Sequence, residues 1–197
     1  MLTGSSLDDM YAICGSLSYV YKVFDGLRVT NVVSWSIVIV RYKEHDNDEK
    51  VEVGSTLGNT LVDMYCKFGL LPQAQEAFDK VMVRDSVIWN AIIGGYLEHG
   101  HVVDALRCFK QMRYGVVPPD VLTFAFSLKA YGGIAGGIKE GQDIHTEICW
   151  KGLESDTFLG NVLVDMYAKA GYVTEAHQVF GRLLTRDVVS WTSLIMA

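Results

Sequence analysis

The sequence predicts an all-α fold, a right-handed α-solenoid of stacked helix-turn-helix repeats. Two observations carry this prediction. The chain repeats itself at a fixed offset, because the pentapeptide Leu-Val-Asp-Met-Tyr occurs at residues 61–65 and again at 163–167, 102 residues later. Within that period, apolar residues recur twice per unit with the i, i+3, i+4, i+7 spacing of amphipathic helices. Repeats of this size dictate the architecture, because each unit buries its apolar face only against its neighbours.

The offset of 102 residues joins further identical residues, namely Gly69 with Gly171, Phe78 with Phe180, Asp85 with Asp187 and Trp89 with Trp191. A third, less complete copy lies upstream. Its identical residues precede their partners by 54 positions, and they are Asp9, Met10, Tyr11, Gly15, Phe24 and Trp35. This offset is 48 residues short of the full period, so we expect an internal deletion between the first and second copies.

Each unit is expected to hold two helices that form a hairpin. In residues 55–85 the two apolar stripes are Leu61, Met64, Tyr65 and Phe68, followed by Ala74, Ala77, Phe78 and Val81. A glycine separates the two stripes in four units, at Gly15, Gly69, Gly100 and Gly171. Glycine adopts the left-handed conformation that ends a helix, so these positions mark the hairpin turns. Small residues at the helix contacts allow close approach, as at Ala74, Ala105 and Ala176.

The aligned boundaries divide one solenoid domain into seven segments. Residues 1–31 form a short unit, and residues 32–54 form a truncated unit with a charged linker. The next four units are 55–85, 86–120, 121–156 and 157–187, and residues 188–197 begin another. The first three of these four units have 31, 35 and 36 residues, which together make up the 102-residue period. The last unit again has 31 residues.

Composition narrows the classes of function. No apolar run reaches the ~18 residues of a membrane span, so we expect no membrane association. The start, Met1-Leu2-Thr3-Gly4, has neither a signal peptide nor a visible transit peptide. The four cysteines are widely spaced, which suits a reducing compartment. The net charge of −6 argues against a strongly electrostatic nucleic-acid binder, although local basic patches remain compatible with it.

The sequence resembles the pentatricopeptide repeat family, in its subclass with alternating short, standard and long repeats. Residues 160–169, Gly-Asn-Val-Leu-Val-Asp-Met-Tyr-Ala-Lys, are similar to the start of a short repeat. Residues 186–191, Arg-Asp-Val-Val-Ser-Trp, are similar to its junction with a standard repeat. Residues 122–124 and 141–145 resemble a long repeat. Compared with the family pattern, the chain is expected to be truncated and internally deleted.

The resemblance implies that each repeat reads one base of single-stranded RNA through its fifth and last residues. The corresponding residues here are Ser5 with Asn31, Ser36, Asn59 with Asp85, Asn90 with Asp120, Ala125 with Asp156, Asn161 with Asp187, and Thr192. An asparagine amide offers both a donor and an acceptor to a base edge. In the family, an Asn–Asp pair favours uridine and the Ser–Asn combination resembles an adenine reader. The pair formed by Ala125 and Asp156 fits no familiar combination.

The resemblance also implies base-flanking positions, and the places of two lysines suggest phosphate contacts. The second residue of each repeat flanks the bases, and these residues are Leu2, Val33, Thr56, Val87, Leu122, Phe158 and Val189. Lys67 and Lys169 occupy equivalent places late in a first helix, where a cation meets phosphate. An alternative for both lysines is a solvated position favoured by the helix dipole.

A second alternative concerns the Asn and Asp residues themselves. Both residue types are common helix N-caps, so periodicity alone favours a capping role, whereas the resemblance favours base reading. The series Asp9, Asp63 and Asp165 falls once per unit, which indicates a structural role rather than a catalytic pair. His145-Thr146-Glu147 matches half of a zinc deaminase signature, but no Cys-x-x-Cys accompanies it. We therefore expect no metal, no cofactor and no catalytic activity.

By resemblance, the expected function is sequence-selective RNA binding in a mitochondrion or chloroplast, in RNA processing or in the recognition of C-to-U editing sites. The expected partners are single-stranded RNA and editing-factor proteins that supply catalysis, and no DNA. One alternative is a protein-binding helical scaffold of the tetratricopeptide kind. The unequal unit lengths and the absence of a Trp-x-x-Leu-Gly-x-x-Tyr string argue against it. Another alternative is a truncated product with little function.

Overall fold

The computed structural model describes residues 55–115 and 117–195. The chain divides into two units, Met1–Val51 and Glu52–Ala197, and the described residues belong to the second. The predictions for residues 1–54 therefore lie outside the described residues. Within the described part, the regular elements are all α-helices, and they are α4 (Ser55–Lys67), α5 (Leu71–Lys80), α6 (Ser86–Glu98), α7 (Val102–Tyr114), α8 (Val121–Gly132), α9 (Ile138–Trp150), α10 (Thr157–Lys169), α11 (Val173–Arg182) and α12 (Val188–Ile195).

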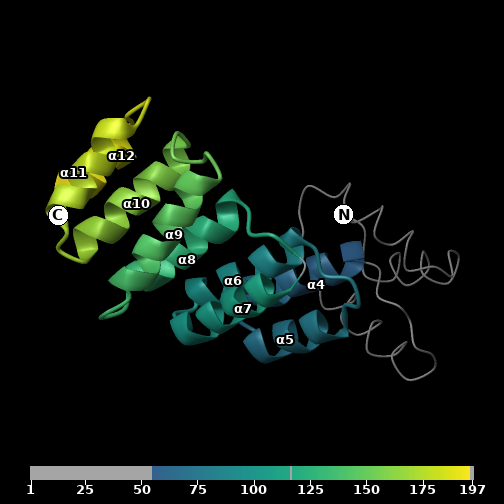
Figure 1. The fold of residues 1–197 in the computed structure, drawn as a ribbon. Coiled ribbons are helices and arrows are strands. Elements are labelled where there is room, and N and C mark those ends of the chain that lie inside the picture. The colour runs from purple at the N-terminus through teal and green to yellow at the C-terminus, as the bar shows by residue number, and fades with distance from the viewer. Residues whose placement is uncertain (1–54, 116, 196–197) are drawn as a thin grey trace, which may run out of the picture. The chain divides into compact units, whose positions relative to one another are not determined.

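The helices form antiparallel hairpins that stack side by side (Figure 1). The first helices make one layer, because α4 packs on α6, α6 on α8, α8 on α10 and α10 on α12. The second helices, α5, α7, α9 and α11, each pack on their own partner and on the first helix of the next hairpin. This two-layer arrangement confirms the predicted α-solenoid of helix-turn-helix repeats. None of the described helices has the length and apolar character that a membrane span needs.

The hairpin turns depend on glycine. Gly69, Gly100 and Gly171 have φ angles of +70°, +78° and +79°, which confirms the prediction made for these three positions. The amide that follows each glycine closes the turn; for example, the N–H of Leu70 donates to the carbonyl of Tyr65 at 2.9 Å. In the hairpin of α8 and α9, the left-handed residue is Gly136, with φ +82°.

The apolar stripes predicted in residues 55–85 are buried in the core, except for Phe68, which lies beyond the end of its helix. Leu61, Met64 and Tyr65 of α4 are buried, and so are Ala74 and Phe78 of α5. The prediction for Phe68 was wrong, because its side chain is 43% exposed. The reason is that α4 ends at Lys67, so Phe68 already lies in the turn and has left the helical face that its spacing implied.

The sequence repeat is reproduced at the level of single contacts. The rings of Phe78 and Trp89 meet edge to face with centroids 4.7 Å apart, and those of Phe180 and Trp191 do the same at 4.7 Å. In both copies an arginine caps the second helix: Arg84 donates from Nε to the Phe78 carbonyl at 3.2 Å, and its equivalent, 102 residues later, makes the same bond at 3.1 Å. Each junction between hairpins in these two copies is therefore specified by the same aromatic and arginine contacts.

Close approach of neighbouring first helices depends on glycines that face side chains. A Cβ atom added to Gly95 of α6 would overlap Sγ of Cys66 on α4. A Cβ on Gly132 of α8 would lie 3.2 Å from Met166 on α10. These glycines bring the layer of first helices together tightly, and this layer carries the groove described below.

We expect Gly95→Ala to lower the free energy of unfolding by about 1–3 kcal/mol, because the added methyl overpacks the contact between α4 and α6. The matched control is Gly181→Ala in α11, where an added Cβ meets nothing within 4 Å. This control should raise the free energy of unfolding by about 0.5–1 kcal/mol, since alanine is the better helix former. Urea denaturation followed by circular dichroism measures both. Two changes of the same sign would contradict the packing argument.

Candidate nucleic-acid interface

Three asparagines on first helices each contact an aspartate that precedes the next first helix. Nδ2 of Asn59 donates to both carboxylate oxygens of Asp85, at 3.3 Å each. Nδ2 of Asn90 donates to both oxygens of Asp120 at 3.0 Å. The third pair, Asn161 and Asp187, has distances of 3.2 and 3.4 Å. The same amide-to-carboxylate contact thus recurs at three steps of the described solenoid.

The aspartates of these pairs also cap helices. Oδ1 of Asp85 accepts the backbone N–H of Ile88 at 3.0 Å, and Oδ1 of Asp120 accepts that of Thr123 at 2.9 Å. Asp156 and Asp187 make the same bond to the third residue that follows them. The capping alternative is therefore correct for the aspartates. It does not hold for the asparagines, which lie inside first helices and bond to the caps.

A hydroxyl completes two of the three pairs. The Thr123 hydroxyl donates to Oδ1 of Asn90 at 2.7 Å, and the Ser190 hydroxyl donates to Oδ1 of Asn161 at 2.6 Å. At the first pair this position holds Ile88, which has no donor on its side chain. Oδ1 of Asn59 is accordingly buried without a hydrogen-bond partner.

Hydrogen bonding favours the ionised form of Asp120 and Asp187. Burial of Asp120 acts to raise its pKa, but hydrogen bonds from the Thr123 backbone and from the side chains of Asn90 and Thr123 outweigh burial and lower the pKa. The pKa of Asp187 is also lowered, chiefly by the backbone N–H and the hydroxyl of Ser190. Asp120 and Asp187 are therefore charged acceptors that bind the neighbouring amide strongly.

A groove of about 450 Å³ collects the predicted residues from three successive hairpins. Its walls come from α4, α6 and α8, which neighbour one another in the layer of first helices (Figure 1). The lining residues are Asn59, Asp63, Cys66, Lys67, Val87, Asn90, Ala91, Gly94, Gly95, Glu98, Asp120, Leu122 and Phe126. Two of the asparagines, one aspartate and two apolar flanking residues predicted from the sequence thus share one concave surface.

Four of the predicted base-flanking residues are exposed hydrophobic side chains in the described part of the chain. Val87 is 58% and Phe158 is 52% exposed, and Leu122 and Val189 are exposed as well. Exposed apolar side chains beside paired polar groups provide walls against which a flat ring packs. Sequence reasoning missed Phe126, which lies one helical turn after Leu122 and also lines the groove. Its ring reaches the glycine at position 94, where a Cβ atom would lie 2.9 Å from Cζ.

Each of the two predicted phosphate-binding lysines is held by a carboxylate one turn earlier. Nζ of Lys67 lies 2.6 Å from Oδ2 of Asp63, and Nζ of Lys169 lies 2.6 Å from Oδ2 of Asp165. Both pairs are largely exposed, so solvent weakens the attraction. The structural role predicted for Asp63 and Asp165 takes the form of these ion pairs, and any anion must compete with a carboxylate for the lysine.

The remaining predicted residues lie apart from this groove or outside the described residues. Ala125 is buried and brings no polar group toward Asp156, which serves only as a cap in the hydrogen bonds described. The Thr192 hydroxyl donates to the Val188 carbonyl at 2.6 Å within α12. The residues outside the described part are Leu2, Ser5, Asn31, Val33 and Ser36, and the side chain of Thr56 is not described either.

His145 serves a packing contact. Its Nδ1 lies 2.9 Å from the Tyr167 hydroxyl, which joins α9 to α10, and burial, followed by the positive charge of Arg182, lowers the pKa of the imidazole. The hydroxyl of Thr146 donates to the Gln142 carbonyl within α9. Among the described residues, no three His, Cys, Asp or Glu side chains are grouped as a metal site requires.

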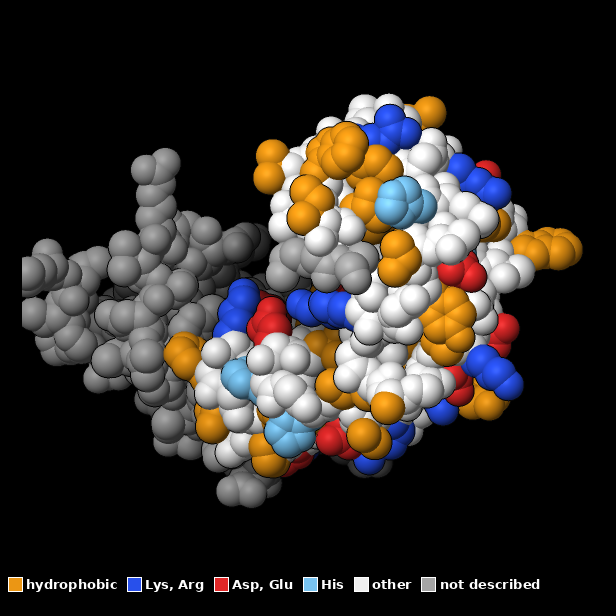
Figure 2. Space-filling model, turned by 90° about the vertical axis from the view of Figure 1, so that its left-hand side faces the viewer, with side chains coloured by type: hydrophobic (Ala, Val, Ile, Leu, Met, Phe, Trp, Pro, Cys, Tyr) orange, Lys and Arg blue, Asp and Glu red, His pale blue; other side chains and the backbone are white. Residues whose placement is uncertain are grey.

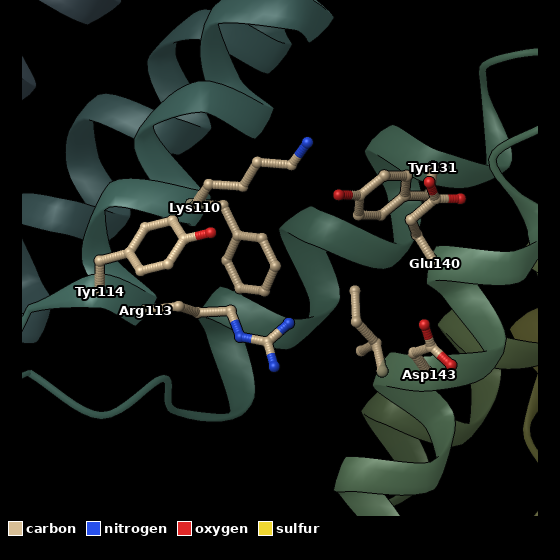
Figure 3. A pocket seen from close by; sticks show the side chains of 8 residues that line it. Lys110, Arg113, Tyr114, Tyr131, Glu140 and Asp143 are labelled. Carbon is tan, nitrogen blue, oxygen red and sulfur yellow. The ribbon is translucent and has the colours of Figure 1, made fainter.

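A second groove, of about 470 Å³, lies on the layer of second helices (Figure 3). Lys110 and Arg113 of α7 reach it from one side, while Glu140 and Asp143 of α9 reach it from the other. Arg113 also pairs with Glu147 at 3.1 Å. This groove thus carries two basic and two acidic side chains, and its charge is mixed in sign.

The surface seen from the side of α11 and α12 mixes all side-chain types (Figure 2). Basic and acidic side chains alternate on this face, and hydrophobic side chains gather in its upper part. The exposed hydrophobic residues of α12 are Val188, Val189, Trp191 and Ile195. The described part of this face therefore carries no single basic patch, in agreement with the net charge of −6.

Comparison with known families identifies the repeat. The model of the PPR repeat family matches residues 84–132, and the model of the PPR repeat matches residues 59–85 and 161–188. Together the matches cover more than half of the chain and contain all three Asn–Asp pairs. The chain belongs to the pentatricopeptide repeat family. The predicted family is thereby confirmed.

Plant members of the family align along the whole chain. A mitochondrial pentatricopeptide repeat-containing protein of Arabidopsis thaliana is 30% identical over 100% of this chain and 38% of its own length. A chloroplastic one from the same plant is 31% identical over 100% of this chain and 39% of its own length. The chain thus spans less than two fifths of these pentatricopeptide repeat relatives. The first alignment extends over 248 positions for 197 residues, so the relative has residues that this chain lacks.

A solved structure shares the fold. The crystal structure of the pentatricopeptide repeat protein PPR10 in complex with an 18-nt psaJ RNA element superposes with a TM-score of 0.70, at 17% identity. The match covers 98% of this chain and 29% of PPR10. At this level of identity the likeness establishes the fold, which is the solenoid described above.

The capping role of Asp120 gives a test of the junction. We expect Asp120→Ala to lower the free energy of unfolding by about 0.5–2 kcal/mol, because the Thr123 N–H loses its acceptor. Asp120→Asn keeps an acceptor oxygen and should cost distinctly less. Chemical denaturation compares the two variants. Equal losses would mean that the charge, and not the capping bond, stabilises the start of α8.

Proposed function

We propose that this chain binds single-stranded RNA along its layer of first helices, one base per hairpin. The observation that carries the proposal is the groove in which Asn59, Asn90 and Asp120 lie beside the exposed side chains of Val87 and Leu122. Such a groove offers amide and carboxylate groups to a base edge and apolar walls to its faces. Both are the means by which proteins bind unpaired bases. The crystallised complex of PPR10 with RNA supports the proposal through a shared fold.

The Asn–Asp pairs favour uridine in this proposal. Uracil presents an N–H donor next to carbonyl acceptors, and an asparagine amide offers the matching acceptor and donor. Nδ2 of Asn90 donates to both oxygens of Asp120 at 3.0 Å, and in this proposal one amide hydrogen is shared between the two oxygens while the other is left for the ligand. The base readers are accordingly Asn59 with Asp85, Asn90 with Asp120, and Asn161 with Asp187, while Ala125 with Asp156 contributes no amide.

The repeat boundaries 55–85, 86–120, 121–156 and 157–187 belong to the same proposal, since each unit then supplies one fifth residue and one last residue. In this proposal the array of repeats also includes residues 1–31, 32–54 and 188–197. Their base-reading residues are Ser5, Asn31, Ser36 and Thr192. The residues of the mitochondrial relative that this chain lacks support the internal deletion. Deletion limits the contiguous readers to a few, so the affinity is modest.

We further propose that this protein acts in a mitochondrion or a chloroplast, because its relatives carry one or the other location in their names. There it selects a site in an organellar RNA for processing or for C-to-U editing. An editing-factor protein supplies the chemistry, since the groove side chains described here serve hydrogen bonding and packing. RNA immunoprecipitation from isolated organelles, followed by sequencing, tests this assignment.

Substitution of a reader tests RNA binding directly. We expect wild type to bind a uridine-rich oligomer more tightly than an adenine-rich one at matched salt. Asn90→Ala should weaken uridine binding by about fivefold to tenfold, the effect of losing one hydrogen bond worth about 1 to 1.4 kcal/mol. Gln178→Ala is the control, because this exposed amide lies on α11, in the layer of second helices and away from the proposed RNA-binding layer. Fluorescence anisotropy measures all three, and equal affinity of wild type for both oligomers would contradict the proposed preference.

The ion pair at Lys67 gives a separate test of phosphate binding. We expect Asp63→Asn to strengthen RNA binding severalfold at low salt, because Lys67 loses its competing carboxylate. The slope of log affinity against log salt concentration should become steeper by about 1, which corresponds to one additional phosphate contact. The control is Glu76→Gln, which removes the same charge from an i, i+4 pair on α5, in the other layer. If both variants change binding equally, net charge explains the effect and Lys67 does not bind phosphate.

A further inference from the structure

The three Asn–Asp pairs are not equivalent, and they differ at one position. The residue three places after the aspartate is Thr123 in the second pair, Ser190 in the third and Ile88 in the first. All three side chains are fully buried at the base of the pair. Two of them therefore place a hydroxyl beneath the asparagine amide, and the first places a hydrocarbon there.

Where the hydroxyl is present, both ends of the asparagine amide are hydrogen-bonded. Asn90 donates from Nδ2 to Asp120 at 3.0 Å while its Oδ1 accepts from Thr123 at 2.7 Å. Asn161 has the same pair of bonds, with Ser190 at 2.6 Å. Thr123 is fixed in turn, because its Oγ1 accepts the backbone N–H of Asp120 at 3.2 Å. The same hydroxyl lies 2.9 Å from Oδ1 of Asp120, so its one hydrogen is shared between the amide oxygen and the carboxylate. Carboxylate, amide and hydroxyl thus form a closed three-residue network.

Asn59 makes fewer hydrogen bonds than the other two asparagines. Its Nδ2 lies 3.3 Å from each oxygen of Asp85, and its buried Oδ1 has no hydrogen-bond partner. A buried acceptor without a donor is costly, so this amide gains free energy when it turns toward water or a ligand. The amides of Asn90 and Asn161 gain nothing comparable, and they keep one orientation. An orientation that is fixed before binding costs less entropy when the ligand arrives.

We propose that Thr123 and Ser190 are positioning residues for base recognition. Each holds the amide of the preceding repeat's asparagine in the orientation that discriminates uridine, whereas Ile88 leaves Asn59 a weaker discriminator. The inference rests on the proposed RNA binding and adds a third residue to each reading pair. It also ranks the three pairs, with Asn90 and Asn161 above Asn59.

The experiment measures the ratio of affinities for a uridine oligomer and for oligomers in which single uridines are replaced by adenosine. Ser190→Ala and Thr123→Val remove the hydroxyls with little change of volume. Each should lower the discrimination at one nucleotide by about threefold to tenfold, the effect of one hydrogen bond. Thr123→Ser keeps the hydroxyl and should keep the ratio. Ile88→Thr supplies a hydroxyl to Asn59 and should raise discrimination at a different nucleotide.

The readout separates positioning from stability. A residue that only stabilises the helix start weakens binding to all oligomers alike and leaves the ratio unchanged, so an unchanged ratio in a folded, RNA-binding Ser190→Ala variant overturns the inference. Circular dichroism verifies folding, and the two hydroxyl deletions at different junctions serve as independent trials. If wild type binds no oligomer, the proposed function itself fails, which is a different outcome. Equal discrimination at the nucleotides facing Asn59 and Asn90 in wild type also contradicts the ranking.

Discussion

The carboxylate between consecutive hairpins is the interaction on which the arrangement of the described solenoid depends. Asp120 accepts the backbone N–H of Thr123 and so starts α8, while it also accepts the amide of Asn90 on α6. One ionised group therefore sets where a helix begins and where the neighbouring repeat's polar side chain lies. Because the same contact recurs at Asp85 and Asp187, the polar groups advance along the layer in step with the helices. Local capping and the spacing of the groove thus have a common cause.

Packing beneath the Asn–Asp pairs determines how closely successive first helices approach one another. Gly95 lies against Cys66, and Gly132 lies against Met166, so the first helices approach one another closely at these points. Between the layers, the Phe78–Trp89 contact of α5 with α6 and its copy at residues 180 and 191 join successive hairpins through the same edge-to-face geometry. The groove is a product of both layers, because the second helices support the first helices from behind. Side chains that never meet a ligand thereby control the distance between those that do.

Much of this fold was predictable from the sequence, because repetition and helical spacing are properties of order along the chain. The hairpin glycines Gly69, Gly100 and Gly171, and the buried stripes, follow from such patterns. Phe68 was misplaced because spacing alone does not show where a helix ends. The pairing of Asn90 with Asp120 was expected from family resemblance, but the hydroxyl of Thr123 beneath it was not, although Asp-x-x-Thr is a capping-box pattern. Phe126 escaped notice because its place in the groove depends on a glycine of another repeat, which no local pattern reveals.

The contact between Gly95 and Cys66 has a chemical consequence for the groove wall. Burial, reinforced by the negative charge of Asp63, raises the pKa of the Cys66 thiol to about 12, and burial raises that of Cys108 to about 11. Thiolate is the form that reacts with peroxide and disulfides, and very little of it exists at either residue near neutral pH. The sulfur in the groove therefore behaves as an apolar atom that fits against glycine. Oxidants that act on thiolates therefore react slowly with Cys66.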